Sequence, residues 1–163
     1  MKTLLILRHA KSSWDDASMS DFERPLNGRG LRAAPFIGEL MRRRELVPET
    51  ILSSPAMRAR TTAELVQQAG AFDAEIAFVD DIYEASPGSL RQAVAEINDA
   101  FTTALLVGHN PGIEGFIRYL TGKLEPMPTA ALAVVELEVD RWSEVDEGSG
   151  ELNAVIRPRE EMI

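Results

Sequence analysis

The chain has 163 residues, and 45% of them are hydrophobic, so it is long enough to bury a core without disulfides or a structural metal. It contains no cysteine, which excludes a disulfide scaffold, a thiol nucleophile and a thiolate zinc site. The formal net charge of −9 at pH 7 disfavours general attraction to nucleic acid or to an anionic membrane. We therefore expect a single domain over residues 1–163, with neither nucleic acid nor membrane as a partner.

The beginning of the chain bears on where the protein works. The first residues, Met1-Lys2-Thr3-Leu4, lead directly into an apolar run of strand length, which leaves no room for a secretory signal. No apolar run approaches the length of a membrane span. We expect a cytoplasmic protein, and the sequence leaves its oligomeric state open.

Strand-like and helix-like patterns alternate along the chain. Short apolar runs predict strands at residues 3–7, 50–53, 76–79, 104–107, 132–139 and 152–157. Helical patterns fall between them at residues 30–46, 56–69, 89–100 and 112–120. This alternation predicts an α/β fold with a mostly parallel sheet that is covered on both faces.

Several residues refine these boundaries. Asn27 is suited to cap the first helix, and Pro111 is suited to the first position of the last one. Pro35 is tolerated only near a first helical turn, so the first helix should start late or bend there. The alternating residues 134–139 and the acidic, glycine-containing residues 140–150 predict an antiparallel hairpin at the sheet edge.

The chain has two histidines, and each directly follows a predicted strand. His9 follows the first strand together with Arg8, and His109 follows the strand at residues 104–107. A third junction, after residue 53, leads to Arg58. Because the carboxyl ends of parallel strands lie at one edge of a sheet, we expect these two arginines and two histidines to meet in one pocket.

This set of side chains suits a phosphoryl group. The planar fork of arginine matches phosphate oxygens, and helix N-termini add N–H donors. A neutral imidazole nitrogen can attack phosphorus, and the cation of Arg8 opposes protonation of His9. We therefore interpret His9 as a nucleophile, while Lys11 and Ser12 are further candidate donors to phosphate in the loop that follows.

The sequence resembles the histidine phosphatase, or phosphoglycerate-mutase-like, superfamily, and in detail its short SixA-type phosphohistidine phosphatases. The resemblance rests on an ordered set of motifs: Leu7-Arg8-His9-Ala10-Lys11-Ser12-Ser13-Trp14, Asp21 to Leu26 with Arg29-Gly30, Ser53-Ser54-Pro55 with Arg58, Arg60, Thr61 and Thr62, and Gly108-His109-Asn110-Pro111.

This resemblance implies a three-layer α/β/α sandwich and a hydrolase that needs no metal or other cofactor. It implies His9 as the phosphorylated nucleophile, Arg8 and Arg58 as phosphate clamps, and His109 as a donor to the phosphoryl oxygens. The sequence also argues against a metal hydrolase, since its histidines are isolated and no H-E-x-x-H spacing occurs.

The general acid stays open. Relatives that cleave alcohol phosphates use a carboxylic acid, which in one branch directly follows the second histidine, where this chain has Asn110. Glu84 and Asp21 are the two candidates, and each is equally well explained as a loop or turn residue, Asp21 then pairing with Arg24. A phosphoramidate asks less of a strong acid than an ester does, so this weak signal favours a phosphohistidine substrate.

Three functions follow from the sequence. The first is removal of phosphate from a protein phosphohistidine, for which a short chain without long insertions leaves an open pocket. The second is hydrolysis of a small phosphate ester, and the third is a phosphate- or phosphopeptide-binding module without turnover. The complete set of nucleophile, clamps and second histidine exceeds what binding alone requires.

Overall fold

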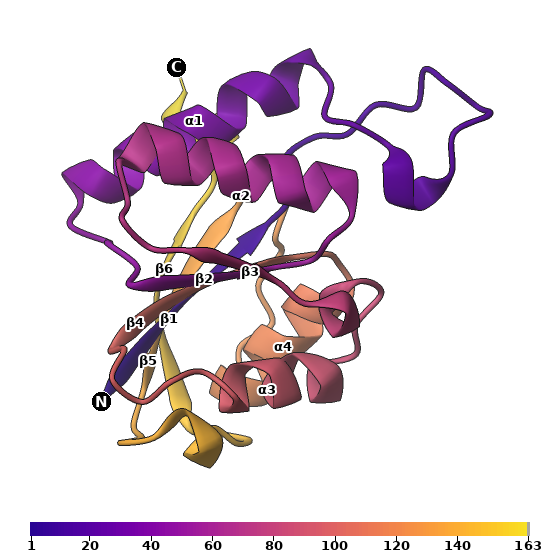
Figure 1. Ribbon diagram of the computed structural model, residues 1–163. Helices are drawn as coiled ribbons and strands as arrows, with labels where there is room; N and C mark the ends of the chain where they lie inside the picture. Colours follow the sequence, from indigo (N-terminus) through magenta and orange to yellow (C-terminus); the bar gives the residue numbers. More distant parts are fainter. Residues whose placement is uncertain (163) are drawn as a thin grey trace.

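A six-stranded sheet forms the centre of the molecule, whose structure, a computed structural model, describes residues 1–162 (Figure 1). The strand order is β3-β2-β4-β1-β5-β6. The strands are β1 (Lys2–Arg8), β2 (Thr50–Ser53), β3 (Ile76–Phe78), β4 (Thr103–Gly108), β5 (Leu132–Leu137) and β6 (Gly150–Ile156). The first four in spatial order pair in parallel, whereas β5 is antiparallel to β1 and to β6. The predicted mostly parallel sheet is confirmed.

Helices cover both faces of this sheet and make three layers. Figure 1 shows α1 (Gly28–Arg43) and α2 (Met57–Gly70) over one face, with α3 (Pro87–Ala95) and α4 (Gly112–Thr121) over the other. The short α5 (Pro158–Glu161) lies against α1. Three single turns, η1 (Asp21–Glu23), η2 (Asp80–Ile82) and η3 (Trp142–Glu144), lie in the connections. The expected α/β/α sandwich is confirmed.

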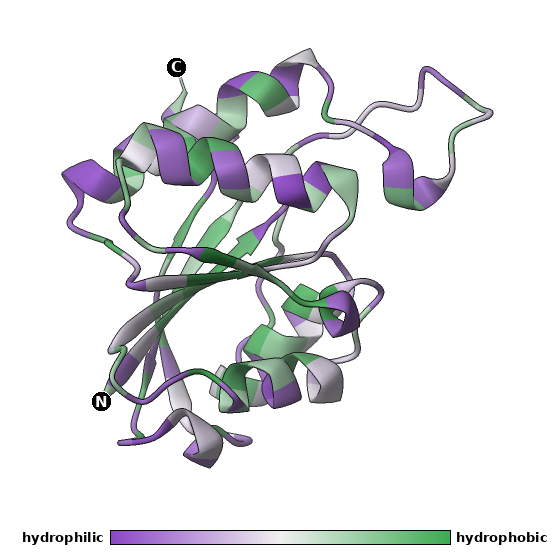
Figure 2. Cartoon of the chain, viewed as in Figure 1, coloured by the Kyte–Doolittle hydropathy of each residue, from purple (hydrophilic) through white to green (hydrophobic). Residues whose placement is uncertain are grey.

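The continuous apolar run of β1 reflects burial on both faces. Leu5 and Leu7 pack with α1 and α2, whereas Leu4 and Ile6 pack with α3 and α4. All four side chains are completely buried. Because successive strand residues point to opposite faces, a strand between two helical layers must be apolar at every position. Figure 2 shows the resulting hydrophobic strands in the middle of the molecule.

The first helix begins earlier than predicted. The side chain of Asn27 accepts a hydrogen bond from the backbone N–H of Gly30 (2.9 Å), which confirms the predicted N-cap. Pro35 consequently lies well inside α1, and the prediction that the helix would start late was wrong. The proline leaves the carbonyl of Leu31 without its helical donor, and water can replace that donor because Leu31 is exposed.

Small shifts also occur near the later elements. Pro111 is the residue before α4 rather than its first position, since the helix begins at Gly112. The predicted hairpin is confirmed as the antiparallel pair of β5 and β6, with η3 in its connection. None of the helices in the described part of the chain combines the length and the apolar character that a membrane span requires.

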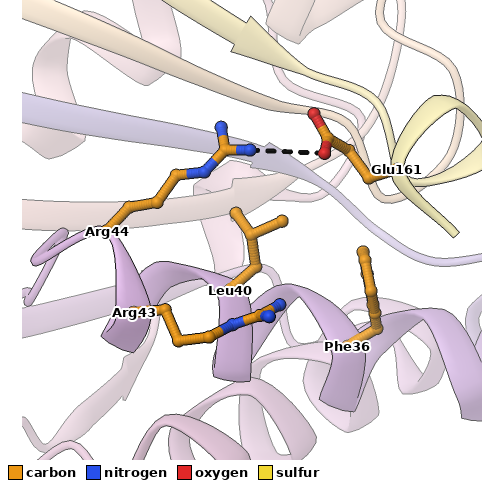
Figure 3. Close-up of a pocket in the computed structure, with 5 residues that line it drawn as sticks. All are labelled: Phe36, Leu40, Arg43, Arg44 and Glu161. Atoms are coloured by element: carbon orange, nitrogen blue, oxygen red, sulfur yellow. Dashed lines mark hydrogen bonds and ion pairs between the residues drawn. The ribbon is translucent and has the colours of Figure 1, made fainter.

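The end of the described chain is tied to α1. Figure 3 shows a shallow pocket between them, in which Arg44 pairs with Glu161 at 3.3 Å. Phe36 and Leu40 form its floor. This contact joins α5 to the C-terminal end of α1, and Arg159 of α5 also lines a groove with Arg8, at the carboxyl end of β1.

Candidate active site

Both histidines lie at the carboxyl edge of the parallel strands. His9 directly follows β1, His109 directly follows β4, and Ser54 directly follows β2, which neighbours β4. The ring centroids of the two histidines are 5.1 Å apart. The fold therefore brings together two side chains that are far apart in the sequence.

The ring of His9 is held in one orientation. Its backbone N–H donates to the carbonyl of Gly108 (3.0 Å), which joins the ends of β1 and β4. Its Nδ1 lies 2.7 Å from the carbonyl oxygen of Ala10, so Nδ1 carries the proton and donates it. The other ring nitrogen, Nε2, then keeps a free lone pair.

This imidazole is neutral at pH 7. Burial lowers the pKa of His9 to about 4, the bond to Ala10 opposes that shift, and the nearby cations Arg58, Arg8 and Arg24 add to it. His9 is only 6% exposed, which agrees with burial as the main cause. The sequence had suggested Arg8 as the cause, whereas loss of solvation has the larger effect. A neutral imidazole with a free Nε2 is the form that can attack an electrophile.

The second histidine is fixed by a hydroxyl. Ser54 Oγ accepts from the backbone N–H of Ala56 (3.2 Å) and lies 2.8 Å from Nε2 of His109. Ser54 Oγ and Nε2 of His109 share a hydrogen bond, and the other ring nitrogen, Nδ1, is buried and has no partner within residues 1–162. Burial, with His9 and Arg58 adding to it, lowers the pKa of His109 to about 3. A neutral ring thus presents one unpartnered nitrogen.

Arg58 enters the site from the first turn of α2. It is 6% exposed, and its two terminal nitrogens donate to the backbone oxygen (2.7 Å) and to Oδ2 (3.1 Å) of Asp21. The hydroxyl of Thr62 donates to the Arg58 carbonyl (2.7 Å) and accepts from the N–H of Ala10 (3.0 Å). One turn of α2 therefore holds both the arginine and the loop that carries His9.

Arg8 enters the site from the last position of β1. Its Nη1 donates to the carbonyl oxygen of Met127 (3.0 Å). The Met127 N–H in turn donates to the carboxylate of Glu114 (3.0 Å), which also accepts from the side chain of Asn110. Asn110 thus fixes the 126–128 segment, and through it the position of the Arg8 guanidinium.

Unused hydrogen-bond donors gather at this place. Within residues 1–162, the buried side-chain nitrogen or oxygen atoms without a partner are Arg8 Nε, Arg58 Nε and His109 Nδ1. Each belongs to the set of residues around His9. Because buried polar atoms are rarely left unsatisfied, this concentration indicates a ligand with several acceptor oxygens.

Asp21 is anchored rather than free. Its carboxylate accepts from the hydroxyl of Tyr83 (2.6 Å), from Arg58 and from Arg24. These partners, the tyrosine first, lower the pKa of Asp21 to about 2, and the same bond raises the pKa of Tyr83 to about 12. The expected pairing with Arg24 is present, and the carboxylate stays ionised at pH 7, which makes it a poor proton donor.

Glu84 lies in the loop between η2 and α3. Its carboxylate is exposed, and its backbone is in the left-handed region (φ 54°). The preceding residue, Tyr83, packs edge-on against the ring of His109 at 5.6 Å. Glu84 is therefore exposed beside the site, where its carboxylate, after that of Asp21, helps to raise the pKa of the Tyr83 hydroxyl.

The two predicted loop donors differ in their surroundings. Ser12 is buried, and its Oγ accepts from Arg24 (2.9 Å), so the hydroxyl is already engaged. Lys11 is exposed and, with Arg8, lines a neighbouring groove. The first residue supports the loop, and the second remains available to a ligand.

Three residues with clear positions in the site were missed as functional residues: Ser54, Tyr83 and Glu114. Ser54 was noted only as part of a motif, although its hydroxyl lies 2.8 Å from Nε2 of His109. Tyr83 directly precedes the candidate acid, which was the available signal. Glu114 lies one helical turn after Asn110, and the i, i+4 spacing could have indicated their contact.

Known proteins are similar to this chain in sequence. The model of the histidine phosphatase superfamily (branch 1) matches residues 4–105. An uncharacterised protein of Mycobacterium tuberculosis is 31% identical over 164 residues, which cover 94% of this chain and 100% of that protein.

Solved structures of similar proteins have the same fold as this chain. The SixA protein of Agrobacterium tumefaciens, a candidate phosphohistidine phosphatase, is 29% identical with a TM-score of 0.82, over 96% of this chain and 98% of that one. A protein histidine phosphatase SixA complexed with tungstate has a TM-score of 0.84 at 23% identity, over 98% and 99% of the two chains, and shows the same fold.

Proposed function

Because this chain belongs to the histidine phosphatase superfamily, we propose that it hydrolyses phosphate groups through a covalent phosphohistidine at His9. We further propose that its substrate is a phosphohistidine carried by another protein. The observation that carries this proposal is the set of buried donors without partners around a neutral imidazole. A phosphoryl group supplies the acceptor oxygens that these donors lack.

In the first step the Nε2 lone pair of His9 attacks phosphorus, and the bond between phosphorus and the leaving group breaks. Arg8, Arg58 and His109 direct their free N–H groups at the phosphoryl oxygens, whose charge they stabilise in the transition state. The hydrogen bond from Nδ1 to Ala10 stabilises the charge that develops on the imidazole.

In the second step water attacks the phosphorus bound to His9. The bond from phosphorus to Nε2 breaks, inorganic phosphate leaves, and the imidazole returns to its neutral form. The depressed pKa of His9 favours this return, because the buried ring is not trapped as an unreactive cation. No step requires a metal ion.

The surroundings of the two candidate acids favour a phosphorus–nitrogen bond in the substrate. Asp21 stays ionised, and Glu84 is an exposed carboxylate beside the Tyr83 hydroxyl. An imidazole leaving group has a nitrogen that titrates near pH 6.5, so solvent can protonate it without a positioned acid. The similarity to the candidate phosphohistidine phosphatase of Agrobacterium tumefaciens supports the same substrate class.

The test compares two substrates in the presence of excess chelator: a peptide with one phosphohistidine and p-nitrophenyl phosphate. We expect chelator-resistant turnover of both, with a higher kcat/KM for the peptide, and loss of both activities in His9→Asn. A marked preference for the ester would contradict the proposed substrate. Binding of both compounds without turnover would indicate a binding module.

Two further variants identify the acid. Glu84→Gln should leave hydrolysis of the phosphohistidine peptide nearly unchanged, whereas Asp21→Asn loosens Arg58 and should slow hydrolysis of the peptide and of the ester to a similar extent. A positioned general acid contributes ~10²–10⁴-fold, so a loss of that size in Glu84→Gln on the ester alone would assign Glu84 to ester hydrolysis.

A further inference from the structure

A basic groove adjoins the active site on the side of α1. It has a volume of about 480 Å³, and its cations are Arg8, Lys11, Arg29, Arg32 and Arg159. No aspartate or glutamate lines it, although the chain carries a net charge of −9. Arg8 is shared with the active site, so a ligand in the groove lies next to the phosphoryl position.

The cations of this groove come from three separate segments. Arg8 and Lys11 come from the end of β1, Arg29 and Arg32 from the first turns of α1, and Arg159 from α5. The first turn of a helix is unfavourable for a cation, because the helix dipole is positive there. Arg29 thus occupies a position that helix stability does not explain.

Within residues 1–162 these cations have no carboxylate partner, since none of the five forms an ion pair. By contrast, Arg44 pairs with Glu161 in the adjacent pocket of Figure 3, and elsewhere Arg157, just before α5, pairs with Glu125 at 3.1 Å. The groove is therefore distinguished by five cations without a lining carboxylate, whereas the adjacent pocket holds a carboxylate beside its arginines.

The type of ligand follows from exposure. Lys11, Arg29, Arg32 and Arg159 are exposed at the rim, and no hydrogen bond fixes their side chains within residues 1–162, whereas Arg58 in the active site is buried and held by two bonds. Small ligands are usually held by a few convergent, buried polar groups. Exposed rim charges instead steer and orient a macromolecular partner.

We propose that this groove binds an acidic surface of the protein whose phosphohistidine enters the active site. The inference rests on the proposed function, and it names the substrate more closely: a phosphohistidine flanked by glutamate or aspartate. The groove offsets the repulsion that the net charge of −9 would otherwise impose on an acidic partner.

The experiment uses two short peptides with one phosphohistidine each, one flanked by Glu and Asp and the other by Gln and Asn. The measured quantity is the ratio of their kcat/KM values at low salt. We expect a ratio of about ten for the parent, since each of several exposed charge pairs contributes modestly, and a decline of the ratio as salt is added.

Two double variants that lose the same charge test whether the groove is the binding site. Arg29→Gln with Arg32→Gln should lower the ratio about three- to fivefold. Arg43→Gln with Arg118→Gln removes the same charge from exposed positions outside the groove, and should leave the ratio unchanged. Equal ratios for the two peptides in the parent, or an equal decline in both variants, would overturn the proposal.

Binding of the unphosphorylated acidic peptide, followed by fluorescence anisotropy, separates this inference from the proposed function. Arg29→Gln with Arg32→Gln should weaken that binding even if the protein does not turn over phosphohistidine. Tripolyphosphate is the competing probe. If it binds more tightly than the peptide, and loses affinity in the same variant, the groove is a site for a small polyphosphate and not for an acidic protein surface.

Discussion

Buried polar and charged side chains have different surroundings at the two ends of the central sheet. At the amino end of β1, Lys2 is 6% exposed, and its ammonium donates to the carbonyls of Asp99 (2.6 Å) and Phe101 (2.8 Å). Its charge also lies 5.6 Å from the ring of Trp142, whose indole N–H donates to the same Phe101 carbonyl (2.9 Å). The protein supplies every partner that this cation needs.

At the carboxyl end the protein leaves donors without partners. Arg58 is buried to the same extent as Lys2, yet its Nε is unpaired, as are Arg8 Nε and His109 Nδ1. Unsatisfied buried groups cost stability, and they persist where a ligand completes them. The amino end is therefore built for stability, and the carboxyl end for binding and chemistry. Substitutions at the two ends should separate these properties.

The largest effect is expected at His9. We expect His9→Asn to lower kcat/KM by about 10⁴-fold or more, because the nucleophile is lost. The amide can still donate to Ala10, so thermal unfolding at pH 7 should match the parent. Comparable turnover in the folded variant would remove His9 as the nucleophile.

The next effect is expected at Arg58. Arg58→Met removes donors to the transition state and should lower kcat/KM by about 10²–10³-fold. The control is Arg42→Met, which removes an exposed arginine at the C-terminal end of α1 that donates to the carbonyls of Gly70 and Ala71 (2.7 Å each). The control should lose stability and keep its activity. A similar loss of activity in both variants would contradict the specific role of Arg58 in the active site.

At the other end of the sheet, Lys2→Met should lower stability and leave activity unchanged. Loss of the ammonium leaves the Asp99 carbonyl without its donor, which should cost about 2 kcal/mol and lower Tm by roughly 4–8 °C. Turnover at 25 °C should be unchanged. The account of the amino end fails if Tm is unaffected.

A more gradual effect is expected from pH. The folded-state pKa values of His9 and His109, about 4 and about 3, lie below the ordinary value of 6.5, so the unfolded chain binds protons first as pH falls. Stability should decline below about pH 6.5 towards pH 4, by at most about 1.4 kcal/mol per pH unit for each histidine.

The low pKa of Asp21, about 2, adds a contribution to the free energy of unfolding. This contribution is lost only as the pH falls below 3.8, the ordinary pKa of aspartate. Chemical denaturation of the parent and of His9→Asn between pH 7 and 4.5 measures the difference. The variant should show the shallower decline, and parallel curves would mean that His9 is not held neutral by the fold.

Much of this architecture follows from the sequence. Strands buried on both faces need unbroken apolar runs, and polar residues directly after such runs lie at one edge of the sheet, so β1, β4, His9 and His109 were predictable. Asn27 was predictable as a cap because the interaction is local.

The remaining features depend on contacts between loops. The position of Asp21 is set by Tyr83 and Arg58, which are distant in sequence and approach only in the folded chain. The basic groove likewise needs α5 beside α1, which no local pattern encodes. Pro35 shows the converse case, in which tertiary contacts override a local rule against proline inside a helix.

The central claim is a covalent phosphoryl group on His9, and rapid-quench mass spectrometry tests it most directly. The enzyme is mixed with a phosphohistidine peptide, quenched in alkali within milliseconds, digested and mapped. We predict an acid-labile phosphoryl group on the peptide that contains His9, formed before inorganic phosphate and absent from His9→Asn. Full turnover with no phosphorylated histidine at any time, or with the group on His109 instead, would contradict the account.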